Sequence, residues 1–145
     1  MGEVVALLQL NPTVGDIESN VAAIERAAAL AASNGASVAW TCELAVCGYP
    51  PRDLLLEDGF VEQCQAAASA VDSPIPLLIG SPIDSGSERT KPANGAVRVG
   101  PGGSGEVTCR KQLLPTYDVF DEARYFEPNL DAGLATAAGM HLGVT

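Results

Sequence analysis

The first 41 residues alternate between two spacings of hydrophobic side chains. Residues 4–8 form a continuous apolar run, which is typical of a strand buried on both faces. Farther along, side chains at helical spacing predict one face of an amphipathic helix: Ile17, Val21, Ile24, Ala28 and Ala31. We expect Asp16 to cap this helix and Gly35 to end it. Residues 37–41 then predict a second strand, parallel to the first in a β-α-β unit.

The next part of the chain continues this mixture of helix and strand. Apolar positions over residues 61–71 predict a second helix, and residues 75–79 predict a third buried strand. A glycine-rich turn separates two alternating segments, so we expect a β-hairpin with strands at 96–99 and 106–110. The pattern therefore predicts the α/β fold class.

The last third of the chain carries fewer regular signals. Residues 111–133 are predicted to be mostly irregular, and they are rich in aromatic side chains, as loops that build functional sites often are. Residues 140–145 begin a strand at the end of the sequence. We therefore expect residues 1–145 to be the N-terminal part of a domain that continues beyond them.

Composition and charge narrow the possible classes of function. The 145 residues include 8 basic and 18 acidic side chains, which gives a net charge of −10 and no basic cluster that could bind nucleic acid. No apolar run reaches the roughly 18 residues that a membrane span needs. The N-terminus also lacks the pattern of a signal peptide. We expect a cytoplasmic protein with neither nucleic acid nor membrane as a partner.

Cysteine spacing gives no metal site. The four cysteines are irregularly spaced in apolar stretches, and the single histidine, His141, is far from each of them in sequence. Buried free thiols are the expected state of such cysteines.

Two charged residues lie at the ends of predicted strands. Glu43 closes the second strand, at the kind of position where open α/β sheets place ligands, and Lys111 closes the second strand of the hairpin. Taken alone, a solvated loop glutamate and a surface lysine are the simpler interpretations. Together at one crevice, the two residues would form a pair suited to proton transfer.

Three segments in order along the chain carry a family resemblance. They are residues 8–16, residues 43–56 with Gly-Tyr-Pro-Pro-x-Asp-Leu-Leu-Leu, and residues 110–126 with Lys-Gln-Leu-Leu-Pro-x-Tyr-x-Val-Phe-Asp-Glu-x-Arg-Tyr-Phe. The chain resembles the nitrilase, or carbon–nitrogen hydrolase, superfamily, and most narrowly the glutaminase domains of the glutamine-dependent NAD+ synthetases. The resemblance implies part of an α-β-β-α sandwich.

The same resemblance implies roles for individual residues. Glu43 matches the general base and Lys111 the cation that stabilises the oxyanion. Glu122 matches a second glutamate that supports the lysine. Tyr49 and Tyr117 match tyrosines that shape the glutamine pocket.

The family's nucleophilic cysteine has no counterpart in residues 1–145. The resemblance places it about two residues past Thr145. We expect Cys42 to point away from Glu43, because neighbouring residues on a strand face opposite sides. Cys47 lies on the segment that leads to Tyr49, and neither thiol is expected to act as the nucleophile. The chain alone is therefore expected to be inactive. Two departures from the family pattern, Thr41-Cys42 and Arg52, affect loop detail.

The function implied by the resemblance is glutamine hydrolysis that supplies ammonia for the ATP-dependent amidation of nicotinic acid adenine dinucleotide to NAD+. It implies a C-terminal synthetase domain that uses ATP and Mg2+, no cofactor for the glutaminase domain itself, and homo-oligomers. Two alternatives stay open: an amidase of the same superfamily with another substrate, and a non-catalytic interaction module.

Overall fold

A five-stranded mixed sheet forms the centre of the computed structural model, which describes residues 3–86, 91–130 and 133–144. Its strands lie in the order β1-β2-β3-β4-β5, and a separate two-stranded sheet pairs β6 with β7. The elements follow one another as β1 (Val5–Leu8), α1 (Ile17–Ser33), β2 (Val38–Thr41), η1 (Arg52–Leu56), α2 (Phe60–Ala70), β3 (Leu77–Ile83), β4 (Ala93–Val99), β5 (Glu106–Arg110), α3 (Glu122–Tyr125), β6 (Gly133–Ala137) and β7 (Met140–Val144).

The N-terminal β-α-β unit folds as the hydrophobic pattern predicts. Strands β1 and β2 are parallel, with the register running from Val5 opposite Val38 to Leu8 opposite Thr41. The side chain of Asp16 caps α1 by accepting the Ser19 N–H at 3.1 Å. Gly35 has a φ of 83° just beyond the helix, in the left-handed region that glycine adopts most readily.

Strands β3 and β4 are longer than their sequence pattern indicates. We predicted residues 75–79 and 96–99, whereas β3 continues to Ile83 and β4 begins at Ala93. Pro82 argues against a strand that continues beyond residue 79, because proline has no N–H to donate to a neighbouring strand. It is tolerated here since β3 pairs with β2 only at Leu77 and Leu78, so the far end of that edge has no strand partner.

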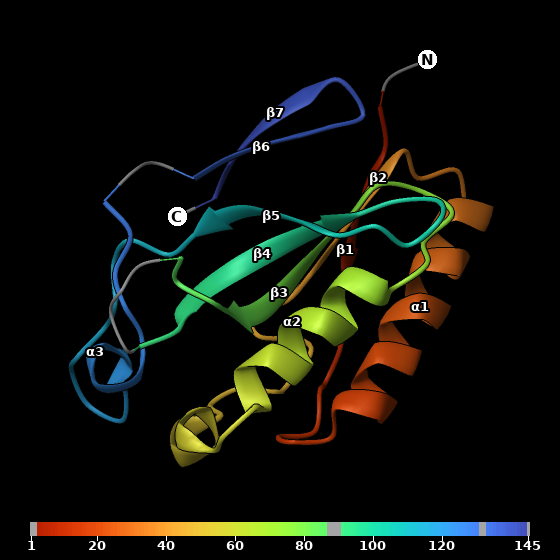
Figure 1. Cartoon of the computed structure of the whole chain (residues 1–145). Helices are drawn as coiled ribbons and strands as arrows, with labels where there is room; N and C mark the ends of the chain where they lie inside the picture. The colour runs from red at the N-terminus through yellow and green to blue at the C-terminus, as the bar shows by residue number, and fades with distance from the viewer. Residues whose placement is uncertain (1–2, 87–90, 131–132, 145) are drawn as a thin grey trace.

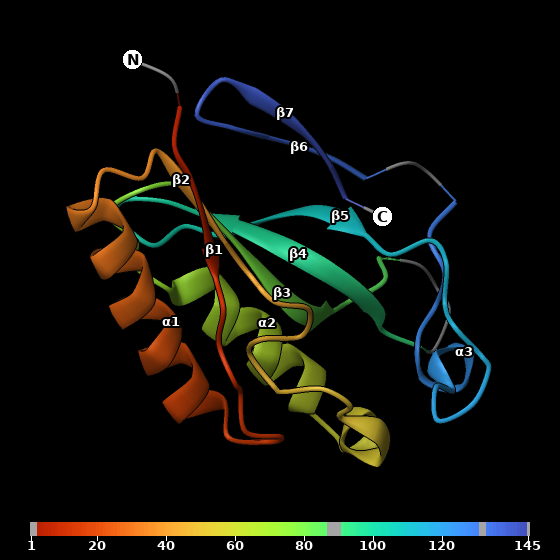
Figure 2. The same ribbon diagram turned by 180° about the vertical axis from the view of Figure 1, so that it is seen from behind.

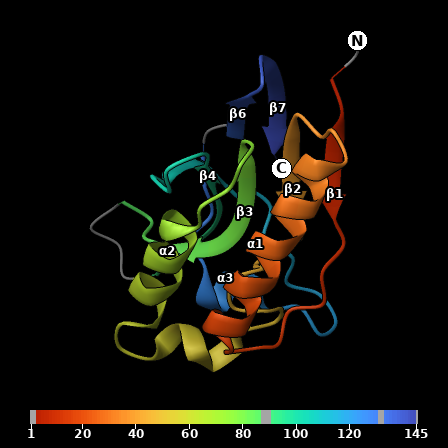
Figure 3. The same cartoon turned by 90° about the vertical axis from the view of Figure 1, so that its right-hand side faces the viewer.

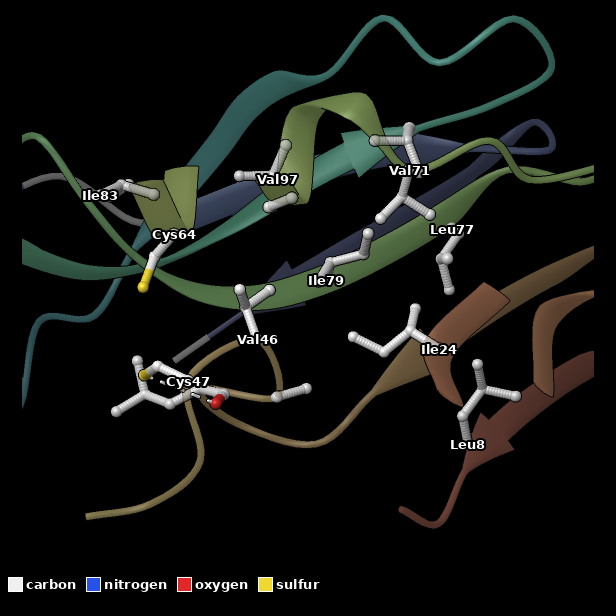
Figure 4. Packing of buried hydrophobic residues seen from close by; sticks show 14 of the residues in the cluster. Leu8, Ile24, Val46, Cys47, Cys64, Val71, Leu77, Ile79, Ile83 and Val97 are labelled. Atoms are coloured by element: carbon white, nitrogen blue, oxygen red, sulfur yellow. Dashed lines mark hydrogen bonds between the residues drawn. The ribbon is translucent and has the colours of Figure 1, made fainter. Parts of the chain in front are cut away.

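The sheet is covered differently on its two faces. Helices α1 and α2 lie on one face, and the β6–β7 hairpin lies on the other (Figures 1, 2 and 3). The main core forms between the helices and the sheet, where Ile24, Leu77 and Ile79 are fully buried (Figure 4). A smaller cluster on the opposite face joins Val38 and Leu78 to Ala135 and Ala137 of β6. The arrangement is the first part of the predicted α-β-β-α sandwich.

Two features of the C-terminal third were not predicted. Residues 122–125 form a short helix, α3, within the stretch that we expected to be mostly irregular. The predicted C-terminal strand is present as β7, but it folds back antiparallel on β6, and the sequence pattern had not indicated β6. Residue 145, included in that predicted strand, lies outside the described residues. Among the described residues, no helix has both the length and the apolar character needed to cross a membrane.

Candidate active site

Glu43 lies in a turn, two residues beyond the strand that was expected to end with it. Strand β2 stops at Thr41, and residues 43–47 form the turn. This turn packs closely on β3, where a Cβ at Gly80 would come within 2.6 Å of the Cys42 carbonyl oxygen and 2.7 Å of the Leu44 nitrogen. Glycine is therefore required at position 80 for the segment carrying Glu43 to approach the sheet.

Lys111 follows β5 directly, at the position predicted for it. Its backbone N–H donates to the Asn94 carbonyl oxygen at 2.7 Å, which continues the pairing of β5 with β4 by one more bond. Its ammonium nitrogen lies 2.7 Å from Oε1 of Glu43, across 68 positions of sequence. The expected proximity of these two residues is therefore present.

A second carboxylate holds the same ammonium. Oε2 of Glu122 lies 2.8 Å from the Lys111 nitrogen, and Glu122 is only 5% exposed. The hydroxyl of Tyr49 donates to Oε1 of Glu122 at 2.8 Å. Four of the five residues singled out by the resemblance thus form one hydrogen-bonded cluster, built from the segment after β2, the end of β5 and the start of α3.

The two carboxylates keep Lys111 protonated. Burial is the largest single effect and lowers the pKa of Lys111, but the hydrogen bonds and negative charges of Glu122 and Glu43 together outweigh it. The pKa of Lys111 is therefore raised above its ordinary value. The side chain is a permanent cation at neutral pH, which suits it to stabilise negative charge and not to act as a base.

A cavity of about 440 Å³ opens beside this cluster. Glu43, Lys111 and Asn94 line it together with Cys42 and Cys109, and Gly143 of β7 closes part of its rim. Strand alternation, on which the expected orientation of Cys42 rested, does not extend to Glu43, because β2 ends at Thr41, and Cys42 and Glu43 both line this cavity. Cys47, in contrast, is fully buried in the main core with Cys64 (Figure 4).

The thiol of Cys42 is poorly suited to act as a nucleophile despite its place. Burial raises its pKa above the ordinary value, and the charge of Glu43 raises it further. Both effects favour the neutral thiol at physiological pH.

Tyr49 and Tyr117 are placed differently from each other. Tyr49 lines a second cavity of about 360 Å³, with Phe120 and Glu122 among its other walls. Tyr117 is 69% exposed and packs its ring edge-on against Phe120, with 5.6 Å between centroids. The structure therefore brings Tyr49, but not Tyr117, to the charged cluster.

Asn94 is a member of the cluster that sequence reasoning missed. Its side-chain nitrogen donates to Oε1 of Glu43 at 2.6 Å, and the residue is 4% exposed. An asparagine inside a buried strand is the signal that could have identified it, since buried polar groups need partners. We had placed the start of that strand at residue 96, after Asn94.

A metal centre has no candidate ligands in the part of the chain that the structure describes. No group of three or more histidine, cysteine, aspartate or glutamate side chains is arranged there to hold an ion. The chemistry of the cluster is therefore derived from its carboxylates and its ammonium.

Residues 4–144 match the carbon–nitrogen hydrolase family, and the chain belongs to that family. The amidase from Nesterenkonia sp., a solved structure, aligns with 96% of the chain at 28% identity and a TM-score of 0.75. The chain covers 53% of that amidase.

Within this family, the chain is similar to glutamine-dependent NAD+ synthetases. The enzyme from Synechocystis sp. is 42% identical over 97% of this chain. The structure of the Acinetobacter baumannii enzyme in complex with ADP aligns with 96% of the chain at 32% identity, with a TM-score of 0.82. The chain spans about a quarter of the length of these synthetases, 26% in both cases.

Proposed function

We propose that the chain contributes the base and the oxyanion-stabilising cation of a glutamine-hydrolysing site, whose ammonia is used to make NAD+. The observation that carries this proposal is the ammonium of Lys111 held between Glu43 at 2.7 Å and Glu122 at 2.8 Å, beside a cavity large enough for an amide substrate. Similarity to glutamine-dependent NAD+ synthetases over nearly the whole chain supports glutamine as the substrate.

Glu43 is the general base in this proposal. It takes the proton of a cysteine thiol, and the thiolate attacks the carboxamide carbon of glutamine to form a tetrahedral intermediate. Glu43 then returns the proton to the nitrogen of this intermediate, and the carbon–nitrogen bond breaks to release ammonia and leave a thioester. Water attacks the thioester while Glu43 accepts its proton, and the cysteine sulfur leaves and regains that proton, so glutamine and water become glutamate and ammonia.

Lys111 stabilises the oxyanion of that intermediate. The positive charge is fixed before the reaction because Glu122 and Glu43 orient the ammonium, so little reorganisation accompanies charge development. Glu122 supports Lys111 through the ion pair, and Tyr49 holds Glu122 in turn. Tyr49 and Tyr117 are proposed to shape the glutamine pocket, and the hydrogen bond from Tyr49 to Glu122 supports this for Tyr49 alone.

The nucleophilic thiol is proposed to come from outside residues 1–145. In a mutant of the Nesterenkonia amidase, the acetamide moiety of fluoroacetamide is added covalently at the active site cysteine. Cys42 lines the cavity beside Glu43 and Lys111 here, but its raised pKa opposes thiolate formation. The remaining parts of the proposal follow the family: a C-terminal synthetase domain that uses ATP and Mg2+, a homo-oligomer, and a cytoplasmic location.

Ammonia release tests the proposal. The protein expressed from its complete reading frame should release ammonia from glutamine and form NAD+ with either glutamine or free ammonia. Lys111→Ala should abolish the glutamine-driven reaction and leave the ammonia-driven reaction intact. Residues 1–145 alone should release no ammonia, and Cys42→Ala should leave turnover in the longer protein within a factor of two.

Three results would contradict the proposal. Glutamine turnover that persists in Lys111→Ala would remove Lys111 from the mechanism. Ammonia release by residues 1–145 that disappears in Cys42→Ala would make Cys42 the nucleophile. Hydrolysis of simple amides such as acetamide, with none of glutamine, would favour an amidase with another substrate.

A further inference from the structure

Asn94 contacts the side chain of Glu43, the general base of the proposed function, on which this inference rests. The residue lies in β4, and its strand partner in β3 is Pro82. Its side-chain nitrogen donates to Oε1 of Glu43 at 2.6 Å, and its backbone oxygen accepts the backbone N–H of Lys111 at 2.7 Å. The backbone of Asn94 is therefore fixed by strand pairing on both sides, while its side chain holds Glu43.

The chemistry of the contact decides which atom of Asn94 faces Glu43. An ionised carboxylate can only accept hydrogen bonds, so the amide nitrogen, which can only donate, must be the atom at 2.6 Å. This hydrogen bond is charge-assisted and partly buried, and charge-assisted hydrogen bonds are short. Asn94 therefore restricts the rotamer of Glu43, whose side chain is otherwise 44% exposed.

Both donors reach the same oxygen of Glu43. Oε1 accepts the amide of Asn94 at 2.6 Å and the ammonium of Lys111 at 2.7 Å. No donor among the described residues bonds to Oε2. A proton placed on Oε1 would point at two donors and lose both hydrogen bonds, whereas a proton on Oε2 keeps them.

We propose that Asn94 is a positioning residue. Its hydrogen bond holds Oε1 of Glu43 in place and leaves Oε2 as the oxygen that accepts the thiol proton. The amide of Asn94 cannot itself take or give a proton at physiological pH, so it orients the base without competing with it. Lys111 supplies the second hydrogen bond to Oε1, and Asn94 adds a donor that is anchored in strand β4.

Two variants of Asn94 separate a positioning role from a structural one. Asn94→Ala removes the donor, and Asn94→Asp keeps the size but replaces the donor with an acceptor. In the protein from the complete reading frame, we expect both to lower kcat for glutamine about 100-fold at pH 7.5 with KM changed by less than threefold, as for a misplaced catalytic group. Ammonia-driven NAD+ formation should not change.

The pH profile gives a signature that a folding defect would not produce. In Asn94→Asp, the introduced carboxyl becomes a donor again when it is protonated. Its kcat relative to the wild type should therefore rise at least tenfold between pH 7.5 and pH 5.5, while Asn94→Ala shows no such recovery. Ser81→Ala is the matched control, because Ser81 is buried in the paired strand and its hydroxyl donates to the carbonyl oxygen of Pro82 and not to Glu43. Its profile should follow the wild type.

A measurement on residues 1–145 tests the contact without catalysis. In an NMR spectrum of the nitrogen-labelled chain, one side-chain amide proton of Asn94 should lie downfield and exchange slowly, and Glu43→Gln should move it upfield. Wild-type kcat and an unaltered profile in both Asn94 variants, or an amide signal insensitive to Glu43→Gln, would overturn the inference. A wild-type protein that releases no ammonia from glutamine would overturn the proposed function instead, and the NMR result would still decide whether Asn94 holds Glu43.

Discussion

The hydroxyl of Tyr49 donates a 2.8 Å hydrogen bond to the carboxylate of Glu122, although 73 positions of sequence separate the two residues. Burial raises the pKa of Tyr49 above its ordinary value, and the hydrogen bond to Glu122 raises it further. The phenol is therefore neutral and remains a donor at physiological pH. This contact connects the segment after β2 to helix α3.

Removing that hydroxyl should weaken the fold. Tyr49→Phe takes the donor from a buried carboxylate, and hydrogen bonds to charged groups contribute about 1.5–3 kcal/mol. We expect the free energy of unfolding in urea to fall by about 2 kcal/mol on that basis. Tyr117→Phe is the matched control, because Tyr117 is 69% exposed and its hydroxyl has no hydrogen bond in the described part of the chain. Equal losses in the two variants would show that the Tyr49 contact contributes nothing.

Replacing the shared cation should be more costly. Lys111→Met leaves the buried carboxylate of Glu122 without its counter-ion, and breaking a buried pair in this way costs about 3–5 kcal/mol. We expect a destabilisation of that order at pH 7, measured by urea unfolding.

Lys91→Met serves as the control for Lys111→Met. The ammonium of Lys91 contacts a backbone oxygen, that of Ala123 at 2.7 Å, in an exposed setting. Loss of this contact should lower the free energy of unfolding by less than about 0.5 kcal/mol, as is usual for substitutions at the surface. A loss in Lys111→Met no larger than that in Lys91→Met would contradict the charge argument.

The raised pKa of Lys111 also predicts how stability depends on alkaline pH. The folded protein holds this proton more tightly than the unfolded chain, in which lysine has a pKa of about 10.4. The stabilisation that protonated Lys111 contributes to the fold is therefore fully present below about pH 10. It is lost as the pH rises through the higher pKa that Lys111 has in the folded protein. The free energy of unfolding should fall more steeply above about pH 10 in the wild type than in Lys111→Met. Parallel curves for the two proteins would contradict this.

Thiol labelling should separate the four cysteines. Cys42 is exposed, whereas Cys47, Cys64 and Cys109 are buried. Under native conditions we expect a maleimide to modify Cys42 alone, and all four cysteines in urea, as located by mass spectrometry of peptides. Because Glu43 helps to raise the pKa of Cys42, Glu43→Gln should speed the labelling at pH 7. Native labelling of Cys47 at a similar rate would contradict its placement in the core.

Gly80→Ala tests the close approach of β3 to the segment that carries Glu43. The added methyl would lie 2.6 Å from the Cys42 carbonyl oxygen, and backbone cannot move aside as a side chain can. We expect a loss of about 1–3 kcal/mol in unfolding free energy, as for overpacking. Gly100→Ala is the control, since a Cβ there meets nothing within 4 Å. A Gly80→Ala protein as stable as Gly100→Ala would contradict the geometry.

The sequence was most informative where chemistry and periodicity are local. The cap by Asp16, the turn at Gly35 and the parallel β1–β2 pair follow from neighbouring residues, and the structure contains all three. The contact of Glu43 with Lys111 could be expected from the family resemblance. Periodicity alone could not show it, because the two residues lie on separate segments.

The features that the sequence did not predict depend on contacts with residues far away along the chain. The strand around Asn94 could not be recognised from its own composition, because a polar residue there is stabilised only by Glu43, 51 positions away. The end of β2 was placed two residues too late, because pairing with β1 and β3 determines where the strand stops. Strand β6 was not recognised because its burial depends on packing against Val38 and Leu78 of the central sheet.

The sequence separations within the charged cluster also govern when it can form during folding. Lys111 and Glu122 are 11 positions apart, so their contact closes a short loop. The contacts of Glu43 with Asn94 and Lys111 span 51 and 68 positions and require β2, β3, β4 and β5 to be aligned first. Loop closure over such distances is slow. The pair of Glu43 and Lys111 should therefore assemble among the last native contacts, and a refolding probe placed on it would report completion of the whole sheet.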